Sequence, residues 1–362
     1  MPDILIFGDL RSYSLRHEVP LPLPDPIAFV ERQGTRHLFA GSLDVPRLRA
    51  LGGYEVRSFE ELGLNDALSR GVSLDDAITE AVSRGCQDVG LTSAVVPRDF
   101  PLQVADHLRA GGLDLHADGE LFDQRRRSKS PGELAGIRRG MRGAEAAMAA
   151  VRAGLADGER SVDALRQAAR RAFIDHGTVP HDMVVIAGGP YGADPHAEGE
   201  GTIEEGVPIV VDVFPRDLQS GAWGDLTRTL CVGEPPAELV EWHRHVREAQ
   251  RLATEAVRAG VSGETLNRIA AGYLSEQGYA TRLGGEEISE GFIHYLGHGL
   301  GLDLHEAPTL DEGGEVLLAG DVVTIEPGLY RPGWGGCRIE DVVLVTETGY
   351  EMLTDCPYDL VV

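Results

Sequence analysis

The chain has 362 residues, of which 42% are hydrophobic and 25% are charged, a composition typical of a folded soluble protein with room for two domains. Its formal net charge of −25 argues against nucleic acids and anionic membranes as partners, because both are negatively charged themselves. No run of about 18 apolar residues predicts a membrane span, and the start MPDILIFGDL does not resemble a secretory signal.

Two residue types narrow the possible chemistry. The four cysteines are scattered and form no C-x-x-C pair, so we expect neither a disulfide framework nor a thiolate zinc site, and we predict a cytoplasmic location. Lys129 is the only lysine, and it lies in the run QRRRSKSPGE, which we interpret as a linker. Schiff-base chemistry and phosphate-binding loops need a lysine inside the site, so neither fits well.

Residues 1–124 alternate short apolar segments with helical ones. Strands are expected at 4–7, 36–41 and 88–92, and helices at 75–85 and 101–112. This alternation predicts a small α/β domain. The basic run that follows, together with a proline, marks its end, and the remainder of the chain forms a second predicted domain.

The second domain, residues 125–362, contains an internal repeat. The sequence VRAG ends a long helical stretch at 151–154 and another at 257–260. Each copy is followed by a second helical stretch, at 161–177 or 265–278, and then by strand-like segments. Two helices followed by strands, twice over, predict a duplicated unit with pseudo-twofold symmetry. A site at the junction of the two halves would draw its ligands from both.

Four carboxylates lie in or beside apolar, strand-like segments, namely Asp212, Asp225, Glu326 and Glu340. The first two are expected to meet across a hairpin. A buried carboxylate needs a cation or several hydrogen-bond donors, so pairing with Arg228 or Arg338 is an alternative to a metal for any one of them. Four carboxylates together would repel one another strongly unless divalent cations neutralised them.

The segment HYLGHGLGLDLHE, residues 294–306, holds three histidines. Its glycines argue against a helix, and the leucines that alternate from 300 to 304 predict a strand. On a regular strand His298 and His305 would face opposite sides, so only one of them would bind a metal directly unless the glycines bend the chain. Structural, hydrogen-bonded histidines are the alternative. Four carboxylates and one imidazole suit two cations such as Mn²⁺, Co²⁺ or Zn²⁺, which together can activate a water for hydrolysis.

The order of these residues resembles that of the pita-bread metallopeptidases, which include aminopeptidase P, prolidase and methionine aminopeptidase. The motifs that carry the resemblance lie within about residues 131–350 and read DLTRT, GHGLGLDLHE, IEPGLY and RIEDV. The preceding residues are similar to the creatinase-type domain of aminopeptidase P and prolidase. The resemblance thus implies an α/β (α+β) protein with a small creatinase-like amino-terminal domain, followed by a duplicated pita-bread catalytic domain.

The resemblance implies five metal ligands. Asp212 would ligate one metal, His298 and Glu326 would ligate the other, and Asp225 and Glu340 would bridge the two. The two aspartates stand further apart than is common in the family, which indicates extra residues in the hairpin loop between 215 and 224. The motif DLTRT is intact, so the assignment of the ligands does not change.

The resemblance also implies catalytic positions, which are His196, His294, His305, Glu326 and Arg338. His294 and His305 would line the substrate site and stabilise charge or relay protons, and His196 would be a further site histidine. Glu326 would accept a proton from the bridging water. Arg338 would hold either a metal ligand or the carboxyl end of the substrate.

The implied activity is that of a metal-dependent exopeptidase, which hydrolyses the amino-terminal Xaa-Pro bond of peptides through a metal-bridging hydroxide. The implied cofactor is a pair of divalent ions, Mn²⁺ foremost with Co²⁺ or Zn²⁺ as alternatives, and the implied substrates are peptides with proline at the second position. Xaa-Pro aminopeptidase activity is favoured. The alternatives are an Xaa-Pro dipeptidase (prolidase), or a relative without peptidase activity that serves in binding or creatine-type hydrolysis. Members of the family are often dimers, which leaves a homodimer open.

Overall fold

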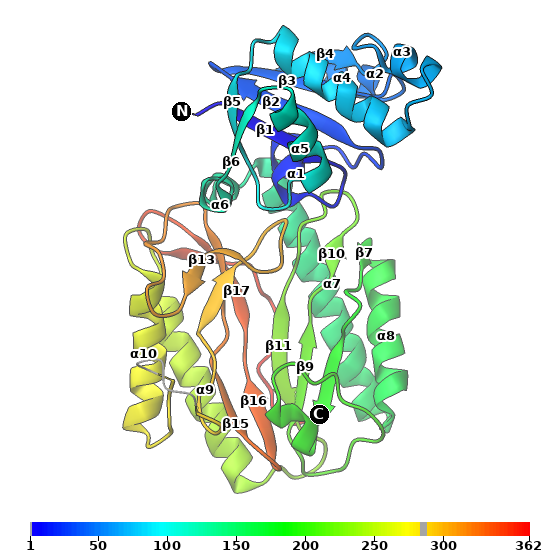
Figure 1. The fold of residues 1–362 in the computed structure, drawn as a ribbon. Coiled ribbons are helices and arrows are strands. Elements are labelled where there is room, and N and C mark those ends of the chain that lie inside the picture. Colours follow the sequence, from blue (N-terminus) through cyan, green and yellow to red (C-terminus); the bar gives the residue numbers. More distant parts are fainter. Residues whose placement is uncertain (1, 283–287) are drawn as a thin grey trace. The chain divides into compact units, whose positions relative to one another are not determined.

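The computed structural model describes residues 2–282 and 288–362, and the chain divides into two compact units, Met1–Arg126 and Arg127–Val362. Figure 1 shows the helices and strands of each unit, coloured along the sequence. None of the helices among the described residues is long and apolar enough to cross a membrane.

The first unit is an α/β domain built on one six-stranded sheet, with the order β4-β3-β2-β1-β5-β6. A hydrophobic core lies on each face of this sheet. In β1, Leu5 packs into the core on one face, while Ile4 and Ile6 pack into the core on the other. The strands are β1 (Ile4–Gly8), β2 (Ile27–Arg32), β3 (Thr35–Ala40), β4 (Glu55–Ser58), β5 (Ser93–Val96) and β6 (Asp114–Ala117). The helices are α1 (Tyr13–Glu18), α2 (Val45–Leu51), α3 (Leu64–Ser69), α4 (Leu74–Asp88), α5 (Leu102–Ala110) and α6 (Gly119–Arg127).

One predicted strand of this unit, at 88–92, is wrong. Helix α4 continues to Asp88, Gly90 adopts a φ of 71°, and β5 begins only at Ser93. Glycine reaches this left-handed conformation at little cost, so the chain leaves the helix in a turn. The apolar residues of the segment suggested a strand because Leu91 is buried in the core from within that turn.

The second unit repeats one arrangement of two helices followed by strands, which confirms the predicted duplication. Its first half consists of α7 (Pro131–Ala156), α8 (Val162–Asp175), β7 (Thr178–Val179), β8 (Val185–Gly188), η1 (Gly189–Ala193), β9 (Ile209–Val213), β10 (Arg216–Asp217) and β11 (Leu226–Leu230). Its second half consists of α9 (Ala237–Glu255), α10 (Gly263–Glu276), β12 (Gly297–Gly299), β13 (Glu306–Leu310), β14 (Val322–Ile325), β15 (Gly328–Arg331), β16 (Gly335–Arg338), β17 (Asp341–Val345) and β18 (Tyr350–Met352).

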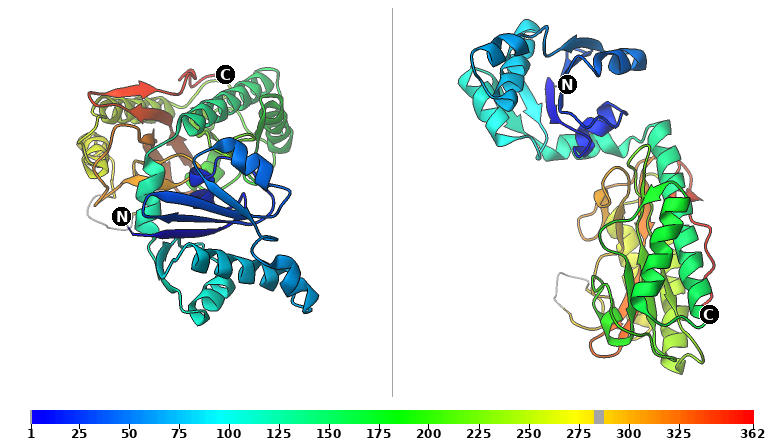
Figure 2. Two further views of the ribbon diagram at one scale, coloured as in Figure 1. Left: turned by 90° about the horizontal axis from the view of Figure 1, so that it is seen from above. Right: turned by 90° about the vertical axis from the view of Figure 1, so that its right-hand side faces the viewer.

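The two helix pairs of this unit flank its strands on opposite sides in Figure 1, with α7 and α8 in green and α9 and α10 in yellow. Figure 2 shows α7 and α8 running side by side. Between them, β9 lies between β8 and β11 in one sheet, and β14 lies between β12 and β17 in another. Strand β16 of the second half contacts β9 and β11 of the first, so the strands of the two halves meet in the middle of the unit.

The run QRRRSKSPGE, predicted to be a linker, is mostly helical and partly buried. Helix α6 ends in it and α7 begins in it. Ser130 caps α7 with a capping box, because its hydroxyl accepts the Glu133 N–H while the Glu133 carboxylate accepts the Ser130 N–H. Arg127 pairs with Asp321 at 2.6 Å, and both side chains are buried. The boundary between the two units falls inside this run, as predicted, but Arg127 and Lys129 in it are partners of buried acidic residues.

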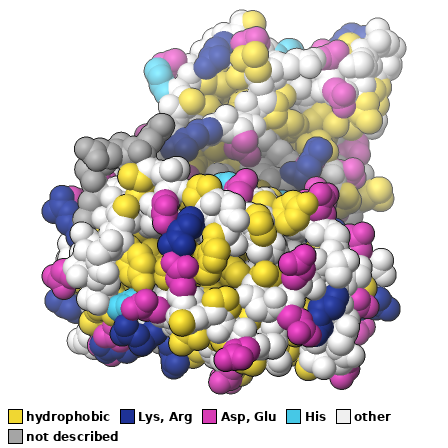
Figure 3. All heavy atoms as spheres, turned by 90° about the horizontal axis from the view of Figure 1, so that it is seen from below, with side chains coloured by type: hydrophobic (Ala, Val, Ile, Leu, Met, Phe, Trp, Pro, Cys, Tyr) yellow, Lys and Arg dark blue, Asp and Glu magenta, His cyan; other side chains and the backbone are white. Residues whose placement is uncertain are grey.

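Acidic side chains are not concentrated in one place on the described part of the face that Figure 3 shows. On the part of the face in Figure 3 that the structure describes, acidic side chains are scattered among basic and hydrophobic ones. Scattered carboxylates on this face agree with a solubilising role for them.

Candidate active site

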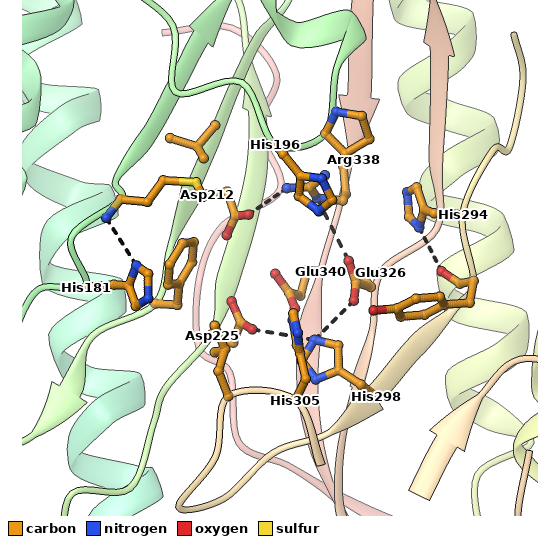
Figure 4. Close-up of a pocket in the computed structure, with 16 residues that line it drawn as sticks. His181, His196, Asp212, Asp225, His294, His298, His305, Glu326, Arg338 and Glu340 are labelled. Atoms are coloured by element: carbon orange, nitrogen blue, oxygen red, sulfur yellow. Dashed lines mark hydrogen bonds and ion pairs between the residues drawn. The ribbon is translucent and has the colours of Figure 1, made fainter. Parts of the chain in front are cut away.

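A cavity of about 390 Å³ lies in the second unit, and its wall includes all nine residues that the sequence singles out as ligands or catalytic groups, namely His196, Asp212, Asp225, His294, His298, His305, Glu326, Arg338 and Glu340. Figure 4 shows their side chains around one space. They come from both halves of the duplicated unit, as expected for a site at the junction of the halves. Whether each residue binds metal or substrate remains a prediction.

The hairpin predicted to join Asp212 and Asp225 is present. Asp212 lies on β9 and faces Thr227 of β11 across an antiparallel pairing. Asp225 directly precedes β11, and its N–H points to the Met141 sulfur at 3.4 Å. The connection between the two strands, where the resemblance implies extra residues, includes the short strand β10.

His298 lies on β12 between two glycines that allow its neighbours to come close. A Cβ atom on Gly297 would lie 2.2 Å from the carbonyl oxygen of Thr324, and one on Gly299 would lie 2.4 Å from that of Ala307. The backbone N–H of His298 donates to the Thr324 hydroxyl at 3.0 Å. The glycines of the motif thus let the strands on either side hold His298 in a crowded, buried place.

The strand predicted through residues 300–304 is wrong, because the chain bends there and returns as β13, antiparallel to β12. We call residues 300–305 the His305 turn. The pairing shifts its register directly after His298. His298 and His305, expected on opposite faces, have ring centroids 4.2 Å apart. The leucines alternate because Leu300 and Leu302 are buried from within the turn.

Three of the predicted ligands form a tight, buried group. One ligand atom each of Asp225, His298 and Glu340 lies within 4.8 Å of the other two. Glu326 approaches the same group, with its Oε1 atom 3.3 Å from the Nε2 atom of His298. The Oδ1 atom of Asp212 is buried and has no hydrogen-bond partner. This donor set of carboxylate oxygens and one imidazole fits divalent cations.

The pKa values show that the negative charge of this group is not fully neutralised by the surrounding protein. Burial, followed by the charges of the other carboxylates, raises the pKa of Asp225 and that of Glu340 well above their usual ranges. Burial also raises the pKa of Asp212, although a neighbouring arginine opposes this. Burial would raise the pKa of Glu326 too, but the hydrogen bond to His298 and the nearby positive charges outweigh it and lower the value to about 2. Bound cations would remove the repulsion.

Arg338 is buried and uses all of its nitrogens within the protein. It donates to Asp212 Oδ2 at 2.6 Å, to the hydroxyl of Tyr330 at 2.8 Å, and to the hydroxyl of Thr227 at 3.3 Å. The resemblance implies two possible roles for Arg338. These contacts support the first, in which Arg338 holds a metal ligand, over the second, in which it binds the carboxyl end of the substrate.

The remaining histidines stand at different depths. His294 hydrogen-bonds with the Tyr330 hydroxyl at 3.0 Å and with a backbone carbonyl oxygen at 2.7 Å, and burial lowers its pKa to about 4. His305 is exposed at the rim, yet partial burial of its ring, and then the charge of His298, lower its pKa to about 4. Both rings are therefore neutral near pH 7 and can donate one hydrogen bond each. His196 is exposed on the cavity wall.

Sequence reasoning missed three residues beside this site. Thr227 donates to Glu340 Oε2 at 2.8 Å, and Tyr330 links Arg338 to His294. Both stand inside recognised motifs, so their positions next to the ligands offered a signal. His181 also lines the cavity, but no motif surrounds it in the sequence and nothing there pointed to it.

Comparisons with known proteins relate the chain to peptidases. Residues 135–347 match the sequence model of metallopeptidase family M24. The "Probable dipeptidase PepE" of Mycobacterium tuberculosis is 32% identical over 327 residues, which cover 89% of this chain and 83% of that protein. The "Xaa-Pro dipeptidase" of Pyrococcus furiosus is 40% identical over 178 residues, which cover 49% of this chain and 48% of that protein.

A solved structure shares the fold of the whole chain. The Xaa-Pro dipeptidase from Bacillus anthracis matches with a TM-score of 0.84 and 25% sequence identity, over 100% of this chain and 95% of that one. The match includes the amino-terminal unit as well as the duplicated one, which confirms the predicted combination of the two folds.

Proposed function

The chain belongs to metallopeptidase family M24, and on that premise we propose that it is an Xaa-Pro dipeptidase that uses two divalent cations. The observation that carries the proposal is the buried group of Asp225, His298 and Glu340, with Asp212 and Glu326 on the same cavity wall. The sequence alone favours an aminopeptidase. The relatives named as dipeptidases and Xaa-Pro dipeptidases move the proposal to dipeptides.

In this proposal, Asp212 would hold one cation, His298 and Glu326 would hold the other, and Asp225 and Glu340 would be shared by both. When bound, the pair of cations supplies Lewis-acid activation of the scissile carbonyl and lowers the pKa of a water. Mn²⁺ is the proposed metal, because oxygen-rich sites with one imidazole suit it. The protein's own part is to hold five ligands rigidly in a place from which bulk water is largely excluded.

The chain's other residues orient groups and move protons. Glu326 is ionised, and it accepts the proton of the attacking water and passes it to the proline nitrogen, which leaves as a secondary amine. His305 donates a hydrogen bond to the carbonyl oxygen as negative charge develops there. Arg338 keeps Asp212 in place through their 2.6 Å contact. The Xaa-Pro bond has no N–H, so recognition depends on the amino-terminal residue and on the proline ring.

The test is hydrolysis of Xaa-Pro dipeptides against Xaa-Pro-Xaa tripeptides by protein first treated with a chelator and then supplied with Mn²⁺, Co²⁺ or Zn²⁺. We expect cleavage to return with metal and kcat/KM to be higher for dipeptides. Higher kcat/KM for tripeptides would make the protein an Xaa-Pro aminopeptidase. No cleavage of either substrate with any of the metals would overturn the proposal.

A further inference from the structure

The only lysine of the chain is buried in an ion pair close to the cavity. The side chain of Lys129 is 2% exposed, and that of Glu306, whose Oε1 atom contacts its Nζ atom, is 1% exposed. Taking two charges out of water is costly, and their attraction offsets that cost only when the geometry is good. Such a pair is weak evidence for stability, so its location needs a different explanation.

The pair lies at the end of the His305 turn. Glu306 directly follows His305 and begins β13, and its Oε2 atom accepts the N–H of Asp303 at 3.4 Å. A Cβ atom on Gly301 would lie 2.3 Å from Glu306 Oε1 and 2.9 Å from Lys129 Nζ, so the pair fits against the turn only because a glycine stands there. The carboxylate of Glu306 thus connects Lys129 to the backbone of the turn.

The beginning of the turn has its own anchor. The backbone N–H of Trp223 donates to the carbonyl oxygen of Gly301 at 2.8 Å, and its indole N–H donates to that of Leu302 at 3.2 Å. Trp223 belongs to the connection between β9 and β11. These bonds hold the first residues of the turn, and Glu306 directly follows His305 at its other end.

We propose that Lys129 is a positioning residue, which acts through Glu306 to hold His305 over the metal ligands; this inference rests on the proposed function. The ring of His305 lies 4.2 Å from that of His298. A misplacement of about 1 Å in a group that contacts the reacting atoms costs roughly 100-fold in rate. A fixed ammonium behind the turn prevents that displacement.

The test compares Lys129→Met with Arg127→Met. Arg127 stands two residues away and forms a similarly buried pair with Asp321, whose carboxylate accepts the backbone N–H of Leu318 at 2.7 Å. We expect Lys129→Met to lower kcat about 10- to 100-fold, with KM changed less than about threefold and metal content unchanged. Arg127→Met should lower the melting temperature while kcat per folded molecule stays within about twofold of the wild type.

A double-mutant cycle separates positioning from general destabilisation. If Lys129 acts through His305, Lys129→Met should cost little further activity in a His305→Ala background. A full additional loss in that background, or an unchanged kcat for Lys129→Met, would overturn the inference. Should Lys129→Met not fold, the double variant Lys129→Met with Glu306→Leu replaces both charges by apolar groups, and full kcat in that variant would equally overturn it.

The proposed function and the positioning role of Lys129 can be tested independently of each other. If the wild-type protein with metal cleaves no Xaa-Pro substrate, the proposed function is wrong. The positioning role is then measured by NMR, using the imidazole resonances of His305 assigned by their loss in His305→Ala. A change of these resonances in Lys129→Met but not in Arg127→Met supports positioning, and no change contradicts it.

Discussion

Glu340 and Asp341 are neighbours in the sequence and both are buried, yet they belong to two clusters with opposite balances of charge. Glu340 shares the cavity wall with three other carboxylates, and burial together with the charges of Glu326 and Asp212 raises its pKa well above the usual range. Asp341 lies in a matched network, and it accepts hydrogen bonds of 2.6 to 2.8 Å from Arg228, Gln250 and Tyr358. Arg228 in turn donates to the backbone carbonyl oxygen of Glu340 at 2.6 Å.

The difference separates a structural cluster from a functional one. Buried polar groups in folded proteins are almost always partnered, and the cluster around Asp341 follows this rule without any ion. The cluster around Glu340 does not, since it leaves the Oδ1 atom of Asp212 without a partner and raises several carboxyl pKa values. A strong excess of one charge in a cavity marks a place where a cation is expected to bind.

The largest effect on activity is expected from removing a charge in the cluster around Glu340. Glu340→Gln keeps the shape of the side chain but removes a carboxylate that the proposal assigns to both cations. We expect it to bind less metal and to lose more than about 100-fold in activity, a greater loss than is usual for residues that only orient a ligand. Metal content by mass spectrometry and kcat in excess Mn²⁺ measure this, and a variant with wild-type activity would contradict the assignment.

Asp225→Asn tests the same cluster of carboxylates through stability instead of activity. Unfolding of the chelated Asp225→Asn protein should show no loss of stability, since a repelled carboxylate has been removed. A marked destabilisation of this metal-free variant would mean that Asp225 is matched by donors in the way that Asp341 is.

In the cluster around Asp341 we expect the opposite result, a loss of stability with activity largely retained. Asp341→Asn leaves the guanidinium of Arg228 buried without its counter-charge, and breaking a buried pair in this way costs about 3–5 kcal/mol of unfolding free energy. Activity per folded, metal-loaded molecule should stay within a few-fold of the wild type. Urea unfolding and kcat with Mn²⁺ test both parts. A stable but inactive Asp341→Asn protein would show that the two clusters are not separate.

Added metal should raise the stability of the folded protein only if the carboxylates around Glu340 bind it. Cations that bind only the folded state at about 100 times their dissociation constant stabilise it by roughly 2.7 kcal/mol. We expect the melting temperature of the chelated wild-type protein to rise on addition of Mn²⁺, and that of Glu340→Gln to rise much less. An equal rise in both proteins would place the bound metal elsewhere.

The sequence predicted most of the first cluster and little of the second. Asp225, His298 and Glu340 stand in short motifs whose order is specific, so their convergence was predictable from the resemblance. For a buried carboxylate the sequence left open a pairing with Arg228 or Arg338. The structure pairs Arg338 with Asp212 and Arg228 with Asp341. Such choices depend on which strands come together and could not be read from spacing.

Two errors near the site have a similar origin. The alternating leucines of the His305 turn follow the period of a strand, although they are buried from a bend held by Trp223. Lys129 stands among arginines and serines in the run that joins the two units, and its burial against Glu306 was not expected from them. In both cases a contact with a residue distant in the sequence overrides the local pattern.

The smallest effect concerns His243 of α9, whose Nε2 atom is buried without a hydrogen-bond partner. Burial, and then the charges of Arg247 and Arg228, lower its pKa from 6.5 to about 4. Its contribution to stability is therefore complete above the unfolded pKa of 6.5 and is lost as the pH falls towards 4. On acidification from pH 7 to 5 we expect His243→Phe to lose on the order of 1–2 kcal/mol less unfolding free energy than the wild type. Both proteins are compared in chelator, so that proton-linked release of metal and the carboxylates of the site contribute equally to the two slopes. Identical slopes would show that this histidine is protonated in the folded protein, and that the network around Arg228 tolerates a further positive charge.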